Sequence, residues 1–193
     1  GIGRDDGKQA GEHSAIFYKT AKFKLLKQGN FWLSTITDRP NKGWDAVLPR
    51  ICTWGEFREI KTGFTFYFFN LHMDHIGVVA RRESAKLVLS RVKQMAGNVP
   101  TILTGDFNVD QTSESYAVVN NSGLLKDCYV LSPIKLAPNG TFNSFNVNTS
   151  NFSRIDHIFI TKNFKVKRYG IFTNTYHGRL PSDHYPVVVE LEH

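Results

Sequence analysis

Short apolar and aromatic runs recur along this chain, and loop-forming residues separate them. Such runs predict strands where β-branched and aromatic residues dominate. They occupy residues 14–18, 23–28, 52–60, 64–71, 101–104, 154–161 and 186–190. The run at 64–71 is almost wholly apolar, which is typical of a strand that is covered on both faces. The chain therefore reads as a series of strands joined by loops.

One stretch has helical spacing. Over residues 78–95, the apolar side chains recur every three or four positions, at Ala85, Val88, Leu89, Val92 and Met95. This stripe predicts an amphipathic helix, and Gly97 and Pro100 are the expected stop signals. A second, shorter helix is predicted over 113–121. Because helices fall between strands, the pattern favours one α/β layered domain with mixed sheets. The asparagine- and serine-rich stretch 139–153 is expected to form a long mobile loop.

The composition fits a globular enzyme-sized domain. The chain has 193 residues, of which 41% are hydrophobic and 21% are charged. No apolar run reaches the roughly 18 residues of a membrane-spanning helix, so no integral membrane segment is expected. The chain starts at Gly1 without a methionine. We expect a soluble protein of unassigned compartment, periplasmic or secreted if a signal was removed. Residues 191–193 look like the remnant of a purification tag.

The charge balance is basic. The formal net charge is +7, which favours a polyanionic partner such as nucleic acid or an acidic lipid surface. The positive charges are dispersed, and the densest group suits a solvent-facing sheet edge: Lys162, Lys165, Lys167 and Arg168. Two cysteines, Cys52 and Cys128, form neither a disulfide framework nor a zinc ligand set.

Two motifs place acids beside amide or imidazole groups where a strand meets a loop. They are Gly105-Asp106-Phe107-Asn108 and Ser182-Asp183-His184. Loops at strand ends are where sheets usually present their chemistry. Each motif alone also fits an ordinary turn, since Asp, Asn and Ser bond to nearby backbone. Arg154-Ile155-Asp156-His157 could likewise be an exposed strand face, and a lone histidine at His72 could be structural.

Taken together, the motifs fit hydrolysis of a phosphate ester. That reaction needs charge neutralisation, an activated water and a stabilised leaving group. Hard cations such as Mg²⁺ bind carboxylate and amide oxygens, which Asp106, Asn108 and Asp183 supply. An imidazole held by a carboxylate is a common acid, base or phosphate donor. His72 and His184 are the candidate imidazoles, and Asp156 is a candidate partner.

The order of these elements resembles the endonuclease/exonuclease/phosphatase superfamily of deoxyribonuclease-like, metal-dependent phosphoesterases. A bacterial branch of the superfamily, whose substrates are largely unassigned, has motifs similar to Phe31-Trp32-Leu33-Ser34 and Gly43-Trp44-Asp45. The aromatic rings of these motifs could instead anchor loops. The resemblance implies a four-layer α/β/β/α sandwich, in which two packed mixed sheets are flanked by helices. It also implies Mg²⁺ or Mn²⁺ as cofactor.

The resemblance also assigns roles. His72 would contact the scissile phosphate, with Asn70 and Arg81 binding substrate. Asp106 would align or deprotonate the attacking water, and Asn108 would contact phosphate and metal. Asp183 would bind the metal together with Asp106 and Asn108. Asp156 would hold His184, which acts as phosphate-binding acid or base. His157 stands where the family usually has a tyrosine.

The chain departs from the family pattern at its start. The family's first strand and a Gln-Glu pair, whose glutamate binds metal, have no counterpart here. Glu12 matches a later family segment and is not that ligand. We therefore interpret residues 1–190 as a single, N-terminally truncated domain that lacks the family's N-terminal strands. Metal affinity, activity and stability are all in question for such a domain, and its sheet would expose an edge.

The sequence thus predicts divalent-metal-dependent hydrolysis of a phosphate ester, with a nuclease-like phosphodiester as the expected substrate. One alternative is a catalytically impaired or non-enzymatic binding domain of the same fold. Another is a zinc hydrolase of the metallo-β-lactamase kind. Asn70-Leu71-His72-Met73-Asp74-His75 matches its His-x-His-x-Asp-His signature at all positions but the first, where asparagine is a poor zinc ligand.

Overall fold

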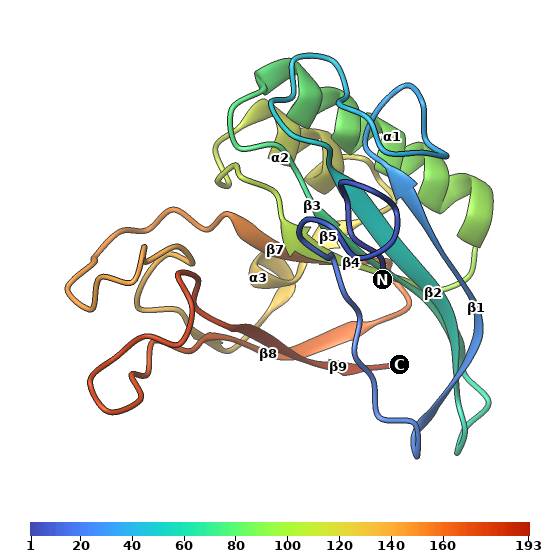
Figure 1. Cartoon of the computed structure of the whole chain (residues 1–193). Coiled ribbons are helices and arrows are strands. Elements are labelled where there is room, and N and C mark those ends of the chain that lie inside the picture. Colours follow the sequence, from blue (N-terminus) through green and yellow to red (C-terminus); the bar gives the residue numbers. More distant parts are fainter.

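The computed structural model describes residues 1–193 and contains two mixed sheets (Figure 1). The large sheet has the spatial order β1 (Phe23–Trp32), β2 (Ile51–Glu59), β3 (Thr65–His72), β4 (Thr101–Asp106), β7 (Asp156–Ile160) and β5 (Lys126–Asp127). The small sheet has the order β6 (Lys135–Leu136), β8 (Lys165–Ile171) and β9 (Val187–Glu192). The helices are α1 (Val78–Ala96), α2 (Glu114–Asn120) and α3 (Cys128–Leu131). The predicted α/β class with mixed sheets is confirmed.

The large sheet separates two apolar cores. Alternation along its strands sends one set of side chains toward α1 and α2, including Phe69, Leu103 and Phe159. The other set, including Ile102 and Ile158, packs against the small sheet. Side chains alternate between faces along a strand, so each strand serves both cores. Figure 1 shows α1 and α2 on one side of the large sheet and β8 and β9 on the other.

The helices begin and end where local chemistry requires. The predicted stripe of α1 is buried at Ala85, Val88 and Val92, and Asp45 accepts hydrogen bonds from the amides of Val79 and Ala80 at 3.2 and 2.6 Å. An acid at a helix N-terminus offsets the positive end of the helix dipole. The Ser113 hydroxyl accepts from the Tyr116 amide and so caps α2.

Two expected local structures were wrong. Residues 14–18 are not a strand, although the carbonyl of Ala15 accepts from the Asn70 side chain at 3.0 Å; Phe17 is 94% exposed. The basic group does not lie on a sheet edge, because Lys165, Lys167 and Arg168 belong to β8, the central strand of the small sheet. Lys167 and Arg168 pair with Glu192 and Glu190 of β9.

The end of the chain belongs to the small sheet. Leu191 and Glu192, which were interpreted as tag residues, are part of β9 and pair with Val166 and Lys165 of β8. On the outer face of β9, Val188, Glu190 and Glu192 are exposed. No helix covers this face. The short helix α3 packs against β8 of the same sheet, where the Tyr129 ring stands edge-on to the Tyr169 ring at 5.3 Å.

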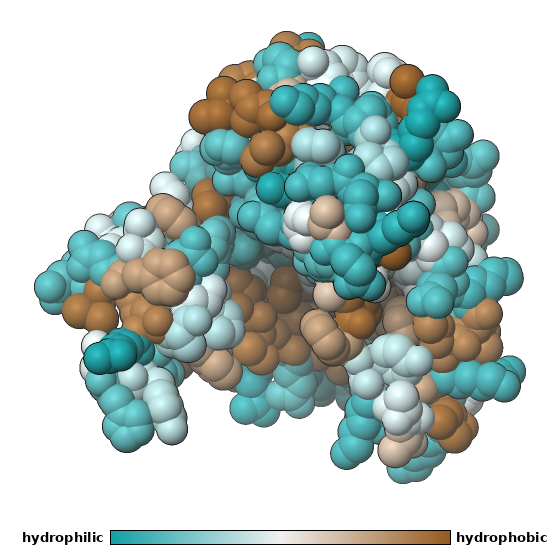
Figure 2. Space-filling model, in the orientation of Figure 1, coloured by the Kyte–Doolittle hydropathy of each residue, from teal (hydrophilic) through white to brown (hydrophobic).

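A groove of about 780 Å³ lies between the sheets. Figure 2 shows it as a hollow with hydrophobic side chains in its depth. Its apolar lining comes from both sheets, namely Phe68, Leu71, Ile102, Ile158, Val187, Val189 and Leu191. β9 is an outer strand of its sheet and lies along the groove. Separately, none of the helices has the length and apolar character needed to cross a bilayer.

Candidate active site

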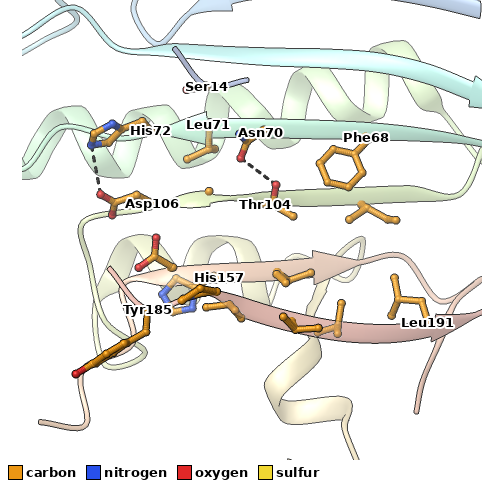
Figure 3. Close-up of a pocket in the computed structure, with 18 of the residues that line it drawn as sticks. Ser14, Phe68, Asn70, Leu71, His72, Thr104, Asp106, His157, Tyr185 and Leu191 are labelled. Atoms are coloured by element: carbon orange, nitrogen blue, oxygen red, sulfur yellow. Dashed lines mark hydrogen bonds and ion pairs between the residues drawn. The ribbon is translucent and has the colours of Figure 1, made fainter. Parts of the chain in front are cut away.

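Three neighbouring strands bring polar residues to one level at the end of the groove. His72 on β3 is in register with Asp106 on the parallel strand β4. Asp106 is in turn in register with Asp156 on the antiparallel strand β7. All three share the sheet face of Phe68, Ile102 and Ile158, because they follow the same alternation. Figure 3 shows His72 and Asp106 facing each other at the mouth of the groove.

Two carboxylate–imidazole pairs converge on one oxygen of Asp106. His184 Nδ1 lies 2.7 Å from Asp156 Oδ2, and its Nε2 lies 3.9 Å from Asp106 Oδ2. His72 Nδ1 lies 3.1 Å from Glu12 Oε2, and its Nε2 lies 3.3 Å from the same Asp106 oxygen. A carboxylate that accepts from Nδ1–H fixes the ring and directs Nε2 outward. Both imidazoles therefore present Nε2 to one point in the cleft.

Backbone contacts hold His184 in place. The Ser182 hydroxyl accepts from the His184 amide at 3.1 Å. Phe142 forms an isolated β-bridge with His184, and its ring stands edge-on to the imidazole at 5.1 Å. The Asp183 carbonyl accepts from the Asn143 and Ser144 amides at 2.7 and 3.1 Å. Residues of the loop 139–153 therefore pack beside His184 and support the Ser182-Asp183-His184 motif.

The Gly105–Asn108 motif is a tight strand ending. Gly105 has a φ of +148°, and an added Cβ would lie 2.0 Å from the Leu71 carbonyl oxygen. Asn108 has a φ of +50°, in the left-handed region that asparagine tolerates. Its amide donates to Asp106 Oδ1 at 2.8 Å, and its side-chain amide donates to the Met73 carbonyl at 3.0 Å. The motif therefore forms the tight turn that its sequence also predicted, and the same turn places Asp106 in the site.

Burial and neighbouring charges shift the titration of these groups. Burial, and then the negative charge of Asp156, raise the pKa of Asp106 to about 6. Burial and the nearby Arg50 and Arg4 guanidinium groups lower the pKa of His72 to about 3. The hydrogen bond to Asp156 raises the pKa of His184 above its ordinary value. Near neutral pH the site therefore holds a neutral His72, an ionised Asp106 and a readily protonated His184.

Glu12 is the site residue that sequence reasoning missed. Arg4 donates to Glu12 through Nη1, and Arg50 Nη1 lies 3.8 Å from the same carboxylate oxygen. Both arginines are buried, and the Trp32 indole fixes the Arg4 carbonyl at 2.8 Å. The available signal was the charged Gly11-Glu12-His13 segment. The sequence-based interpretation that Glu12 is not the family's metal-binding glutamate stays a prediction.

Three predicted residues do not join this cluster. The Asn70 amide is engaged by Ala15 and Thr104, although its side chain lines the groove. Arg81, in the first turn of α1, donates to the Asp74 carbonyl at 2.9 Å. The Asp183 carboxylate is near the Ser182 hydroxyl, at 3.5 Å, and makes no contact with Asp106 or Asn108. Their predicted substrate and metal roles stay predictions.

The donor set for a hard cation is incomplete. Asp106 and Asn108 supply oxygens of the type that Mg²⁺ prefers. However, no three acidic, histidine or cysteine side chains gather in a metal-binding arrangement. Further oxygen ligands would be needed to complete a coordination sphere around Asp106. The fit to Mg²⁺ or Mn²⁺ is therefore partial.

The zinc-hydrolase alternative finds no ligand set either. Asp74 is 1% exposed and accepts from the Ile76 and Gly77 amides and from Arg50 Nε. His75 Nδ1 faces Arg50 Nη2 at 2.8 Å. These contacts give Asp74 and His75 structural roles before α1. The aromatic motif is also structural in part, because Phe31 and Trp32 are buried while Trp44 is partly exposed.

Comparison with known proteins identifies the family of the chain. The model of the endonuclease/exonuclease/phosphatase family matches residues 17–184. The chain belongs to this family. The matched range includes His72, Asp106, Asp156 and His184, so family membership replaces the zinc-hydrolase alternative.

Similar proteins come from bacteria and from a virus. The mannosyl-6-phosphatase of Bacteroides thetaiotaomicron is 56% identical, with a TM-score of 0.96 over 100% of this chain and 75% of that one. A family protein from Bacteroides vulgatus is 38% identical, with a TM-score of 0.94 over 99% and 74%. An uncharacterized protein of Acanthamoeba polyphaga mimivirus is 30% identical over 88% of this chain and 67% of its own length.

Proposed function

We propose that this protein hydrolyses phosphate esters and that phosphorylated sugars are its substrate class. The observation that carries the proposal is the convergence of His72 Nε2 and His184 Nε2 on Asp106 Oδ2, each ring being held by its own carboxylate. A general base must lie within hydrogen-bonding reach of the proton it takes. Asp106, between two imidazoles, meets this requirement for a water in the cleft.

In the proposed reaction, Asp106 aligns a water and accepts its proton as the water attacks phosphorus in line. The bond from phosphorus to the ester oxygen opposite the water breaks, and the departing alkoxide takes a proton from solvent. His72 borders the phosphoryl oxygens on the β3 side. His184, whose pKa is raised by Asp156, donates a proton toward the oxygens that gain charge. A bound Mg²⁺ or Mn²⁺ would neutralise the phosphoryl group, with Asp106 and Asn108 among its ligands.

The sugar phosphate is proposed because of the similarity to a mannosyl-6-phosphatase, at 56% identity over the whole of this chain. A phosphodiester, such as nucleic acid, is the second candidate substrate. It is favoured by the formal net charge of +7, since dispersed positive charge attracts polyanions.

A substrate panel tests the proposal. The purified chain is incubated with mannose 6-phosphate, p-nitrophenyl phosphate or bis(p-nitrophenyl) phosphate, in Mg²⁺, in Mn²⁺ or in EDTA. We expect metal-dependent phosphate release from mannose 6-phosphate, and its loss in Asp106→Ala. Faster cleavage of the diester would favour the phosphodiester instead. Binding of mannose 6-phosphate by calorimetry without turnover under any condition would identify a non-enzymatic binding domain.

A further inference from the structure

His157 is a buried histidine beside the site that the proposed reaction does not use. It follows Asp156 on β7 but points to the opposite face, where it is 1% exposed. Its ring packs against Phe107 and Tyr116, with centroids 5.4 and 4.9 Å away. Burial lowers its pKa, so the ring is neutral near neutral pH and carries a single N–H.

That N–H has a defined acceptor. His157 Nε2 lies 2.9 Å from the Val109 carbonyl oxygen. A carbonyl can only accept, so Nε2 must carry the proton. Nδ1 is then left buried without a hydrogen-bond partner, 3.9 Å from Asp127. An unpartnered buried polar atom costs roughly 1–3 kcal/mol, so a histidine is not the most stabilising aromatic choice at this position.

The bond to Val109 ties the Asp106 motif to β7. Val109 follows Asn108, whose backbone is in the left-handed region. On the other side of Asn108, the Phe107 amide donates to the Ile155 carbonyl at 2.9 Å. The two links from β7 therefore start at Ile155 and His157, the neighbours of Asp156. These two hydrogen bonds fix the position of the loop that carries Asn108 relative to Asp156, which pairs with His184.

We propose that His157 is a positioning residue, which fixes Asn108 and Asp106 relative to Asp156 through its bond to the Val109 carbonyl. The kinetic part of its test rests on the proposed function, whereas the structural part does not. Because β7 is an interior strand of the large sheet and the segment after β4 is a loop, loss of the bond should release the loop and leave the strand in place.

Two variants separate the hydrogen bond from the shape of the ring. His157→Phe keeps a buried aromatic ring without the donor, and His157→Gln keeps an amide donor at similar reach. In amide hydrogen exchange, we expect protection of the Asn108 amide, which bonds to Asp106 Oδ1, to fall about tenfold in His157→Phe. Protection of the Leu103 amide on β4 should not change. His157→Gln should restore most of the protection at Asn108.

Kinetics give a second readout. With a phosphate ester that the wild type cleaves, His157→Phe should lower kcat about tenfold with KM within twofold, and His157→Gln should recover kcat. If the wild type cleaves nothing in the panel, the proposed function fails while the exchange measurement still decides the role of His157. Unchanged protection at Asn108 in His157→Phe would overturn the proposal.

Phe159→Leu is the matched control. Phe159 lies on the same face of β7, is fully buried and also packs against Phe107 and Tyr116, but it makes no bond to Val109. This variant should lower thermal stability, but it should not reduce amide-exchange protection at Asn108 more than at Leu103. Equal loss at Asn108 and Leu103 in both His157→Phe and Phe159→Leu would reduce His157 to a packing residue and reject its positioning role.

Discussion

The two imidazoles of the site have unequal surroundings. His184 is paired with Asp156 on a central strand, and its pKa is raised. His72 is paired with Glu12 from an irregular N-terminal segment, and its pKa is lowered to about 3 by burial and by Arg50 and Arg4. Groups whose environments push their pKa values apart can serve as acid and base at one pH. His184 is therefore the proton donor in our proposal, and His72 stays neutral.

Loss of the Asp156–His184 pair should abolish most activity. We expect His184→Ala or Asp156→Ala to lower kcat by about 10² or more, as is usual for general acid–base groups. Steady-state kinetics on the best substrate of the panel measure this. His193→Ala is the control, because His193 contacts Glu59 and Phe64 instead of the site. Full activity in both dyad variants would refute the assignment.

Glu12→Gln should have a smaller effect. Glutamine keeps an oxygen near His72 Nδ1 but removes the negative charge between Arg4 and His72. We expect kcat to fall about tenfold, with the remaining activity due to the preserved geometry. Glu83→Gln, which affects the pairs with Arg82 and Lys86 on α1, away from the site, is the control. If Glu12→Gln matches the wild type, Glu12 serves only to fix the N-terminal segment.

Asp106→Asn should stabilise the metal-free protein at neutral pH. The folded-state pKa of Asp106, about 6, is above its ordinary value of 3.8. The folded state thus binds the Asp106 proton more tightly than the unfolded state does. The stability that this protonation contributes at low pH is lost as the pH rises from about 4 to 6. We expect the variant to gain about 1–3 kcal/mol over the wild type at pH 7, and little at pH 3.5. Urea unfolding at both values checks this; a gain that is equal at both would contradict the shifted pKa.

Sequence reasoning found most of this site but not its supports. His72, Asp106, Asp156 and His184 were found because each stands at a strand end in a short motif. Glu12 was missed because its partner, His72, is distant in the chain. No local sequence pattern predicts an ion pair between residues so far apart. The bond between the Asn70 amide and the Ala15 carbonyl was not predictable either, because it depends on how an irregular segment crosses the sheet.

At the scale of elements, the close packing of the parallel strands β3 and β4 determines where His72 lies relative to Asp106. Gly105 has its φ at +148°, with the Leu71 carbonyl oxygen 2.0 Å from the place of a Cβ. A side chain there would have to displace backbone of a parallel neighbour. The glycine thereby permits the register that sets His72 beside Asp106.

Gly105→Ala should be strongly destabilising. Because both strain and a backbone clash oppose the added methyl group, we expect a loss of more than about 2 kcal/mol in the free energy of unfolding. Gly63→Ala is the control: Gly63 also has a positive φ, +76°, but nothing lies within 4 Å of an added Cβ, so its cost should stay near about 1 kcal/mol. Urea denaturation compares the two, and equal losses would exclude the clash.

Most of the longer elements followed from the sequence, but the strand β8 (Lys165–Ile171) and the shortest elements did not. The stripe over 78–95 predicted α1 closely, because its apolar face has a clear period and ends at Gly97. Residues 14–18 have strand-like composition but pair with no strand, since strand formation needs a neighbour as well as propensity. β5, β6 and α3, with two to four residues each, are too short to leave a periodic signal.

At the scale of the whole molecule, the sheets cover each other only in part. Ile160, Val166 and Tyr169 are buried between them, but Val187, Val189 and Leu191 of β9 face the groove and are only half-buried. Beyond β9, the irregular segment 13–18 lies against the inner face of the large sheet in place of a strand. The active-site residues thus sit at the end of an open apolar channel.

Dye binding can test this open channel. The native protein should enhance the fluorescence of the apolar dye ANS, because the groove offers a contiguous apolar lining. Val189→Lys, which places a charge in the groove, should reduce the enhancement severalfold. Val78→Lys, at an exposed position in α1 that does not line the groove, should leave it unchanged. Equal fluorescence in wild type and Val189→Lys would show that the dye binds elsewhere.

The open channel also has a calorimetric consequence. The heat capacity of unfolding arises mainly from apolar surface that water reaches only after the chain opens. A chain of 193 residues would ordinarily show a change of ~2.3–2.9 kcal/mol/K. Side chains such as Phe68 and Val189, which line the groove, are already partly hydrated in the native state. The protein should therefore fall below that range and have a flatter stability curve, with its fold less sensitive to warming and cooling than its size suggests.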